Sequence, residues 1–140
     1  MERLVIELPF AEGITPELFL QLQPVINKIK LHAEERSRLN APIHDGTFRE
    51  SILVQPELDG KDIVFNFGAM APIGQILRLH EGEYQLGETS KIQPGTIEGG
   101  VGNKFFTRVI DYWALTWTDL IIDAVLDIFD ESLRENNWRS

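Results

Sequence analysis

The residues best suited to chemistry are two adjacent histidine–acid pairs, His44-Asp45 and His80-Glu81. A histidine beside a carboxylate can transfer protons or bind a metal ion. Neighbouring side chains in an extended chain point to opposite faces, so neither pair can easily chelate an ion alone. The segment after His80 also lacks the second histidine of a helical zinc motif. We therefore interpret both pairs as hydrogen-bonding residues in turns. A small hydrolase that uses His44 or His80 is the least favoured function.

The other candidates for chemistry lack the sequence context that their reactions need. Ser51 and Ser90 are not part of a Gly-x-Ser-x-Gly turn, which exposes the nucleophile in many hydrolases. The glycine-rich run 99–104 does not have the spacing of a phosphate-binding loop. Four acids recur at helical spacing, which is typical of a solvated helix face, whereas calcium loops place acids at alternate positions. These acids are Asp119, Asp123, Asp127 and Asp130.

Composition and charge narrow the function further. The chain has 140 residues, of which 43% are hydrophobic and 25% are charged, and its net charge is −9. This size and balance indicate one globular domain over residues 1–140. The acidic charge argues against a face that binds nucleic acid. Because the sequence has no cysteine, a thiol nucleophile, a disulfide scaffold and a cysteine-built metal site are excluded. An assembly or binding protein without a cofactor is favoured over an enzyme.

Local sequence signals predict the secondary structure of the first part of the chain. Residues 4–8 are expected to form a short strand. The segment Thr15-Pro16-Glu17 combines an N-cap hydroxyl with a proline at the first helical position, which predicts a helix over 16–22. Pro24 interrupts the helical pattern that follows, so we expect the main helix to run separately over 24–39.

The middle of the chain is expected to form a hairpin followed by a long loop. Asp59-Gly60 predicts a tight turn between strands at 51–55 and 62–67. A short helix is predicted over 73–79. Residues 83–103 contain several glycines and no clear periodicity. Connections of this length are usually functional or disordered.

The longest helical pattern lies near the end of the chain. Apolar residues repeat at three-to-four spacing from Val109 to Phe129, and a helix that is apolar over so much of its circumference packs against more than one partner. A second apolar stripe consists of Leu115, Ile122, Leu126 and Leu133. We expect 134–140 to be a loose tail, in which Trp138 indicates an interface. The predicted fold is therefore α+β, with a small antiparallel β-sheet packed against an N-terminal helix and a long C-terminal helix.

Three sequence blocks occur in an order that is typical of one phage family. Residues 41–52 are similar to the block Ala-Pro-x-x-Thr-Gly-x-Leu-Arg-x-Ser-Ile, although Asp45 and Phe48 depart from it. His80-Glu81-Gly82 is similar to a second block, and residues 102–106 are similar to a Gly-x-x-Phe-Leu block that opens the last helix. Over about residues 24–133, the chain thus resembles the HK97 gp10-like family of phage neck and tail-completion proteins. The motif residues are Pro42, Gly46, Arg49, Ser51, Glu81, Gly82, Gly102 and Phe105.

The resemblance implies a structural virion protein with no chemistry and no cofactor. Such a protein would form a homo-oligomeric ring at the neck, head–tail connector or tail-completion level of a tailed bacteriophage, after assembly in the host cytoplasm. Its partners would be copies of itself and neighbouring neck, connector or tail proteins. Genomic DNA would pass through the lumen without sequence-specific binding, which the acidic charge suits because like charges repel. The alternative is a small cytoplasmic interaction module that dimerises through its C-terminal helix.

The resemblance also implies scaffold roles for the motif residues. Gly46 would adopt a backbone angle closed to other residues, and Gly82 would turn the chain into the long loop. Arg49 is expected at the start of a strand, where it could pair with an acid such as Glu81. The candidate interface residues, in the loop and the tail, are Tyr84, Ile92, Ile97 and Trp138.

Overall fold

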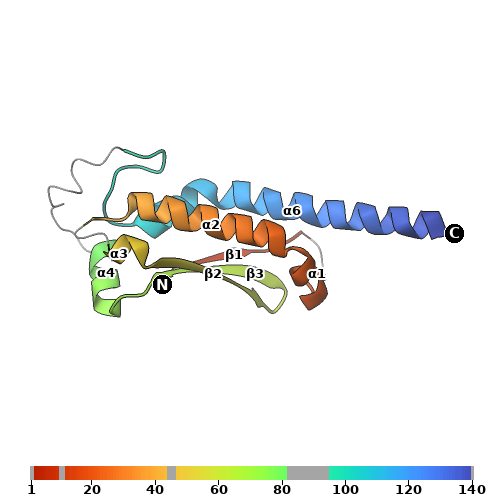
Figure 1. Ribbon diagram of the computed structural model, residues 1–140, viewed down its shortest axis with the longest axis horizontal. Helices are drawn as coiled ribbons and strands as arrows, with labels where there is room; N and C mark the ends of the chain where they lie inside the picture. Colours follow the sequence, from red (N-terminus) through yellow and green to blue (C-terminus); the bar gives the residue numbers. More distant parts are fainter. Residues whose placement is uncertain (1, 10–11, 44–46, 82–94, 140) are drawn as a thin grey trace.

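The computed structural model describes residues 2–9, 12–43, 47–81 and 95–139 (Figure 1). These residues form an α+β fold around a three-stranded antiparallel sheet with the strand order β1-β3-β2. The predicted fold class is confirmed. The elements are β1 (Glu2–Ile6), α1 (Pro16–Gln21), α2 (Gln23–Asn40), α3 (Thr47–Glu50), β2 (Ile52–Asp59), β3 (Asp62–Ala69), α4 (Ile73–Glu81) and α6 (Phe105–Arg139).

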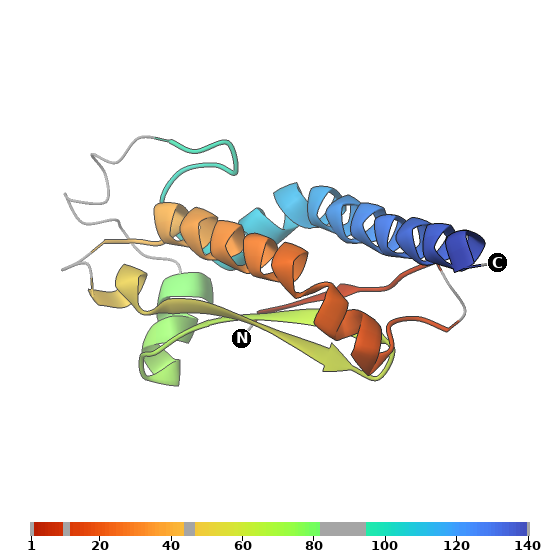
Figure 2. The same ribbon diagram turned by 45° about the vertical axis from the view of Figure 1, so that its right-hand side comes forward.

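The core lies between the sheet and two long helices. Helices α2 and α6 run side by side over one face of the sheet in both views (Figures 1 and 2). The central strand β3 contributes Ile63, Phe65 and Phe67 to the core, and all three are fully buried. From α6, the Trp117 ring stacks on Phe67 with the ring centroids 6.3 Å apart. Burial of these large apolar side chains is the main source of stability.

The other face of the sheet is mixed, since Val5 and the buried Val64 lie on it together with polar side chains. Arg3 on β1 lies opposite Asn66 on β3, and its guanidinium donates to Asp59 Oδ2 over 2.8 Å. Strands β1 and β2 are the two edges of the sheet, since each pairs only with β3 in the described part of the chain. Pro56 lies within the edge strand β2. Of the described elements, the long helices α2 and α6 cover the opposite face.

The local signals in the first half of the chain produce the predicted elements. The Thr15 hydroxyl accepts a hydrogen bond from the Leu18 N–H over 3.1 Å, and the following proline opens α1. Leu22 separates α1 from α2, with Pro24 in the first turn of α2, as expected. Gly60 adopts a φ of 63° in the turn between β2 and β3, which glycine tolerates without strain.

Several elements in the first half of the chain differ from the sequence-based expectation. Strand β1 covers Glu2–Ile6 rather than 4–8, because its register is set by pairing with β3. Residues Thr47–Glu50 form the short helix α3, so Arg49 lies in a helix and not at the start of a strand. The Ser51 hydroxyl donates to the Phe48 carbonyl over 2.7 Å at the end of this turn. Strand β2 begins only at Ile52.

Helix α6 extends well past the body of the protein. The expectation of a loose tail at 134–140 was wrong, since the helix continues through Arg139. Among the side chains described, which end at Glu135, Val125 is the last that is fully buried, and Ile128 still packs against the core. The end of α6 projects beyond α1 in both views (Figures 1 and 2). None of the described helices, α6 included, is both long and apolar enough to cross a membrane.

The contact between the β1–α1 connection and the hairpin gives a stability prediction. The Ile14 N–H donates to the Lys61 carbonyl over 2.9 Å. Gly13 beside it has a φ of 62°, and a Cβ there would lie 2.5 Å from the Lys61 Cβ. We expect Gly13→Ala to lower the free energy of unfolding by about 1–2 kcal/mol from backbone strain and by about 1–3 kcal/mol more from the clash.

Gly60→Ala is the matched control in a urea titration. Gly60 has a φ of 63°, but a Cβ at this position would have nothing within 4 Å. The variant should therefore show only the strain component, about 1–2 kcal/mol. Equal losses in the two variants would contradict a close packing of residue 13 on the hairpin.

Candidate functional site

The three sequence blocks converge at one end of the molecule, which we call the junction. It comprises the end of α2, helix α3, the end of α4 and the start of α6, at the left of Figure 1. The Phe105 ring contacts Phe48 and His80, with ring centroids 5.9 and 5.0 Å away. The Lys104 N–H donates to the His80 carbonyl over 2.6 Å. Segments that are far apart in the sequence are thus joined directly.

The structure corrects the expected partner of Arg49. Its guanidinium donates to the carbonyls of Ala41 and Leu39, over 2.7 and 3.2 Å. It therefore binds the Leu39 carbonyl in the last turn of α2, which has no partner within the helix, and the carbonyl of the residue that follows the helix. The Glu81 carboxylate instead contacts His80 and Lys104. Arg49 is positioned by α3 to close the end of α2 rather than to form the proposed ion pair.

The other motif residues divide between the junction and undescribed parts of the chain. Pro42 is buried after α2, the Gly102 N–H donates to the Asn40 carbonyl over 3.0 Å, and Phe105 is fully buried at the start of α6. The predictions that fall outside the described residues concern His44, Asp45, Gly46, Gly82, Tyr84, Ser90 and Ile92.

Only two of the candidate interface residues belong to described segments. Ile97 is 58% exposed near the start of the described part of the long loop. Trp138 lies within α6 and not in a loose tail. The predicted interface role of Ile97 therefore stays open to test, because an exposed branched apolar side chain on a loop is available for contact.

A buried carboxylate anchors the long loop to both long helices. The Glu98 side chain is fully buried. It accepts two hydrogen bonds from Arg36 on α2, at 2.6 and 2.7 Å, and one from Trp113 Nε1 on α6, at 2.6 Å. The Asn40 amide adds a fourth contact at 3.2 Å. We call Arg36, Asn40, Glu98, Arg108 and Trp113 the Glu98 clasp.

Arg108 completes the clasp from the first turns of α6. Its Nη1 donates to Asn40 Oδ1 over 3.2 Å, and its Nε donates to the Asn103 carbonyl over 3.1 Å. Thr96 donates to the same Asn40 oxygen over 2.8 Å. A Cβ at Gly99 would lie 2.7 Å from Arg108 Nη1. The turn at 96–99 is thus held against the helices by side chains as well as by packing.

The hydrogen bonds of the clasp control the ionisation of Glu98. Burial alone would raise the pKa of this carboxyl, since a charge is poorly solvated there. The hydrogen bonds from Arg36, Trp113 and Asn40 together outweigh burial and hold the pKa far below its ordinary value. Glu98 is therefore ionised at neutral pH, and its charge is matched by Arg36.

A histidine and two tryptophans form a second cluster between α2 and α6. His32 accepts a hydrogen bond at Nδ1 from Trp117 Nε1 over 3.1 Å, and its ring meets the edge of Trp113 with the centroids 4.5 Å apart. Burial, followed by the charge of Arg36, lowers the pKa of His32. A groove of about 380 Å³ borders this cluster, with Leu31 and Leu120 in its lining. The cluster packs the two helices together.

The third cluster surrounds His80 at the junction. His80 is fully buried and stacks against Phe106, with the ring centroids 5.4 Å apart. Its Nδ1 lies 2.7 Å from Glu81 Oε1, and its Nε2 lies 3.5 Å from the Thr107 hydroxyl. Burial is the largest cause that lowers the pKa of His80, and the nearby Glu2 carboxylate opposes it. The ring is therefore neutral at pH 7 and has a hydrogen-bond partner at each nitrogen.

Sequence reasoning missed the Glu98 clasp completely. Glu98 lies 62 positions from Arg36 along the chain, and no short-range pattern connects them. The available signal was a single acid between an isoleucine and a glycine in a glycine-rich loop, with arginines on the preceding long helix.

Comparisons of the chain with protein families, with curated proteins and with solved structures found no match.

The depressed pKa of Glu98 predicts how stability depends on pH. Ionised Glu98 stabilises the fold fully above its ordinary pKa of 4.5, and this contribution is lost as the pH falls further toward the folded-state value. Glu98→Gln should lower the free energy of unfolding at pH 7 by about 2–3 kcal/mol, since Arg36 loses its charged partner. The variant should also lose less stability than the native protein between pH 5 and about pH 3.

Urea titrations at several pH values would test this, with Glu50→Gln as the control at an exposed glutamate of α3. The control should leave the pH dependence close to that of the native protein. If Glu98→Gln retained the native pH dependence, Glu98 would not be the acid-sensitive group.

Proposed function

We propose that this chain is a structural subunit of a tailed-phage virion. It would form a homo-oligomeric ring at the neck, as a head–tail connector or tail-completion component. The proposal combines the resemblance of the three sequence blocks with a surface that an isolated chain leaves exposed. Its partners would be copies of itself and neighbouring neck, connector or tail proteins, first in the host cytoplasm and then in the virion.

The observation that carries the proposal is the apolar stripe on the outer side of α6. Leu115, Leu126 and Leu133 are 81%, 51% and 62% exposed, and Ile122 lies between them in the sequence at helical spacing. Monomeric soluble proteins rarely expose several large apolar residues in one row. We call these four residues the outer stripe. Contact with another protein chain would bury it.

The length of the exposed helical end supports the same conclusion. Beyond Val125 the helix has no fully buried residue in the part whose side chains are described. A helical segment of this length has marginal stability in water without tertiary contacts. A neighbouring subunit that covers the outer stripe would supply those contacts.

The two ends of the molecule suit a subunit placed between layers of a larger particle. The Glu98 clasp fixes the described end of the long loop at the junction. The projecting end of α6 lies at the opposite end (Figure 1). Contacts at both ends would let one ring bind a layer on each side.

The acidic row of α6 fits a passage for DNA. Asp119, Asp123, Asp127 and Asp130 are all exposed, which confirms the predicted solvated face. If this row faces the lumen of a ring, it repels phosphate and prevents genomic DNA from adhering. A basic lumen with the row on the outside would contradict this part of the proposal.

A dimeric interaction module is the second candidate, because the outer stripe could also pair two copies of α6. Its residues recur at intervals of seven, four and seven, which is close to the spacing of a coiled-coil seam. A closed ring and a dimer differ in mass, so a measurement of mass in solution distinguishes them.

Light scattering behind a sizing column, over a range of protein concentrations, tests the proposed assembly. We expect a closed oligomer larger than a dimer, and we expect the double variant Leu115→Ser/Leu126→Ser to remain monomeric because the outer stripe loses its apolar surface. Leu20→Ser is the control, since Leu20 is 71% exposed on α1, outside the stripe.

The control should assemble like the native chain, and circular dichroism should show that all three proteins are folded. A dimer that the double variant disrupts would support the interaction module instead. Assembly that the double variant leaves unchanged would contradict a role for the outer stripe.

A further inference from the structure

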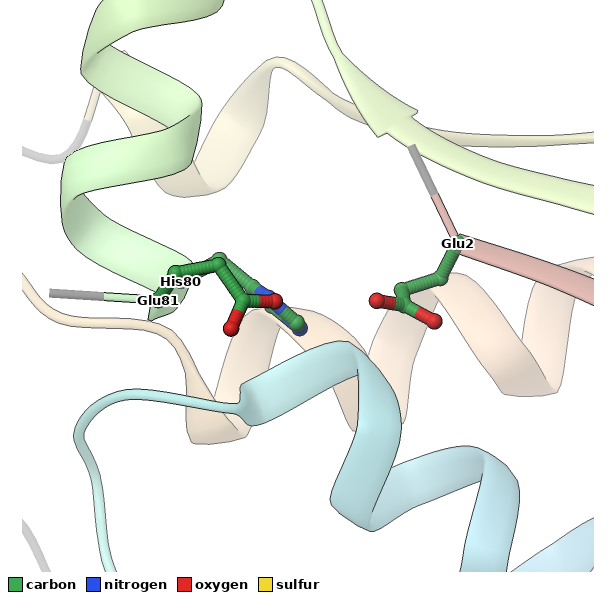
Figure 3. Close-up of side chains that lie close together, drawn as sticks. All are labelled: Glu2, His80 and Glu81. Atoms are coloured by element: carbon green, nitrogen blue, oxygen red, sulfur yellow. The ribbon is translucent and has the colours of Figure 1, made fainter.

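Three potential metal ligands from two distant parts of the sequence meet beside the junction. Glu2 begins β1, whereas His80 and Glu81 end α4. One ligand atom from each of the three residues lies within 4.8 Å of the other two. In the close-up, the Glu2 carboxylate faces the His80 ring and the Glu81 carboxylate across a small gap (Figure 3). We propose that Glu2, His80 and Glu81 bind a divalent transition-metal ion such as Zn²⁺.

The surroundings of His80 suit a metal ligand. Metal ions bind imidazole nitrogens, and the His80 ring is held in one orientation between the rings of Phe105 and Phe106. One ring nitrogen contacts Glu81 and the other lies near the Thr107 hydroxyl. If Nδ1, on the side of Glu81, binds the ion, Nε2 retains the Thr107 hydroxyl as its hydrogen-bond partner. Such a partner commonly fixes the orientation of a metal-binding histidine.

The charges of the side chains around Glu2, His80 and Glu81 favour the binding of a cation. Glu81 forms an ion pair with Lys104, which matches one of the two carboxylates. In the part of the chain that the structure describes, the Glu2 carboxylate has neither an ion pair nor a hydrogen bond. The two carboxylates thus carry one negative charge beyond the one that Lys104 matches, while the Arg108 charge also acts on His80. Lys104 would compete with a bound ion for Glu81. The ion would have to displace the Lys104 ammonium or bind the carboxylate beside it.

Binding requires small movements of the two glutamates. Ligands of a tetrahedral zinc ion at about 2.0–2.1 Å from the metal are ~3.3 Å apart. The three ligand atoms lie within 4.8 Å of one another, so Glu2 would have to move closer, whereas Glu81 Oε1, now 2.7 Å from His80 Nδ1, would have to move slightly away. His80 is held between Phe105 and Phe106 and provides a fixed point. Glu2 is partly exposed and the Glu81 side chain is 41% exposed, so both long side chains can change conformation.

The mixture of ligands indicates the class of metal. One nitrogen and two carboxylates suit Zn²⁺ and its first-row neighbours, whereas Mg²⁺ and Ca²⁺ prefer oxygen ligands alone. A bound ion would cross-link the start of β1 to the end of α4, immediately before the long loop. This role goes beyond the proposed assembly and does not depend on it, so either proposal can fail without the other.

Calorimetric titration of the untagged full chain, first stripped of metal with a chelator, tests the site. We expect one Zn²⁺ per chain, a higher Tm with Zn²⁺ present, and no comparable effect of Mg²⁺. Glu2→Gln and Glu81→Gln should each weaken Zn²⁺ binding by about tenfold or more. Glu7→Gln is the matched control at an exposed glutamate just after β1, and it should bind Zn²⁺ like the native chain.

Lys104→Gln gives an independent readout, because removing the competing ammonium should tighten Zn²⁺ binding. His80→Gln is avoided as the main test, since His80 is fully buried and its loss could unfold the junction. The proposal is overturned if Zn²⁺ does not bind, or if it binds the double variant Glu2→Gln/Glu81→Gln as tightly as the control, which would place the ion elsewhere.

Discussion

The geometry of this protein depends on a mismatch in length between its sheet and its last helix. Each long strand has eight residues, so the sheet is ~27 Å long at ~3.4 Å per residue. Helix α6 has 35 residues and is ~52 Å long at ~1.5 Å per residue. The sheet, with α2 beside it, can therefore cover only the first part of α6. Buried residues from Phe105 to Val125 anchor the helix. Beyond them it leaves the core, which exposes a regular, largely acidic surface with one apolar row.

The Glu98 clasp holds an irregular segment against two helices. Apolar packing alone does not specify one orientation for a glycine-rich turn. A bidentate ion pair with Arg36, together with the Trp113 indole, restricts the carboxylate to one position. Buried ion pairs often contribute little net stability but can select a single arrangement. We infer that the clasp sets where the long loop leaves the body.

The elements that the sequence predicts well are those with signals inside one short window. The cap at Thr15, the break at Pro24, the turn at Gly60 and the periodicity of α6 act within a few residues. The sequence did not predict the features that depend on residues brought together by the fold. These features are the pairing of β1 with β3, the contacts of Arg49 and the whole Glu98 clasp. The tail was mistaken because a polar sequence past residue 133 has no core-facing pattern, yet it continues a helix that is already nucleated.

The edges of the sheet limit how this protein can associate. Strand β1 has only five residues, and the other edge strand, β2, contains Pro56, which has no N–H to offer an incoming strand. Short edges and edge prolines are common ways of preventing strand-to-strand aggregation. Growth of the sheet from one molecule into the next is thus disfavoured. Ordered association is left to helical surfaces, whose side chains can be matched to one partner without templating a fibril.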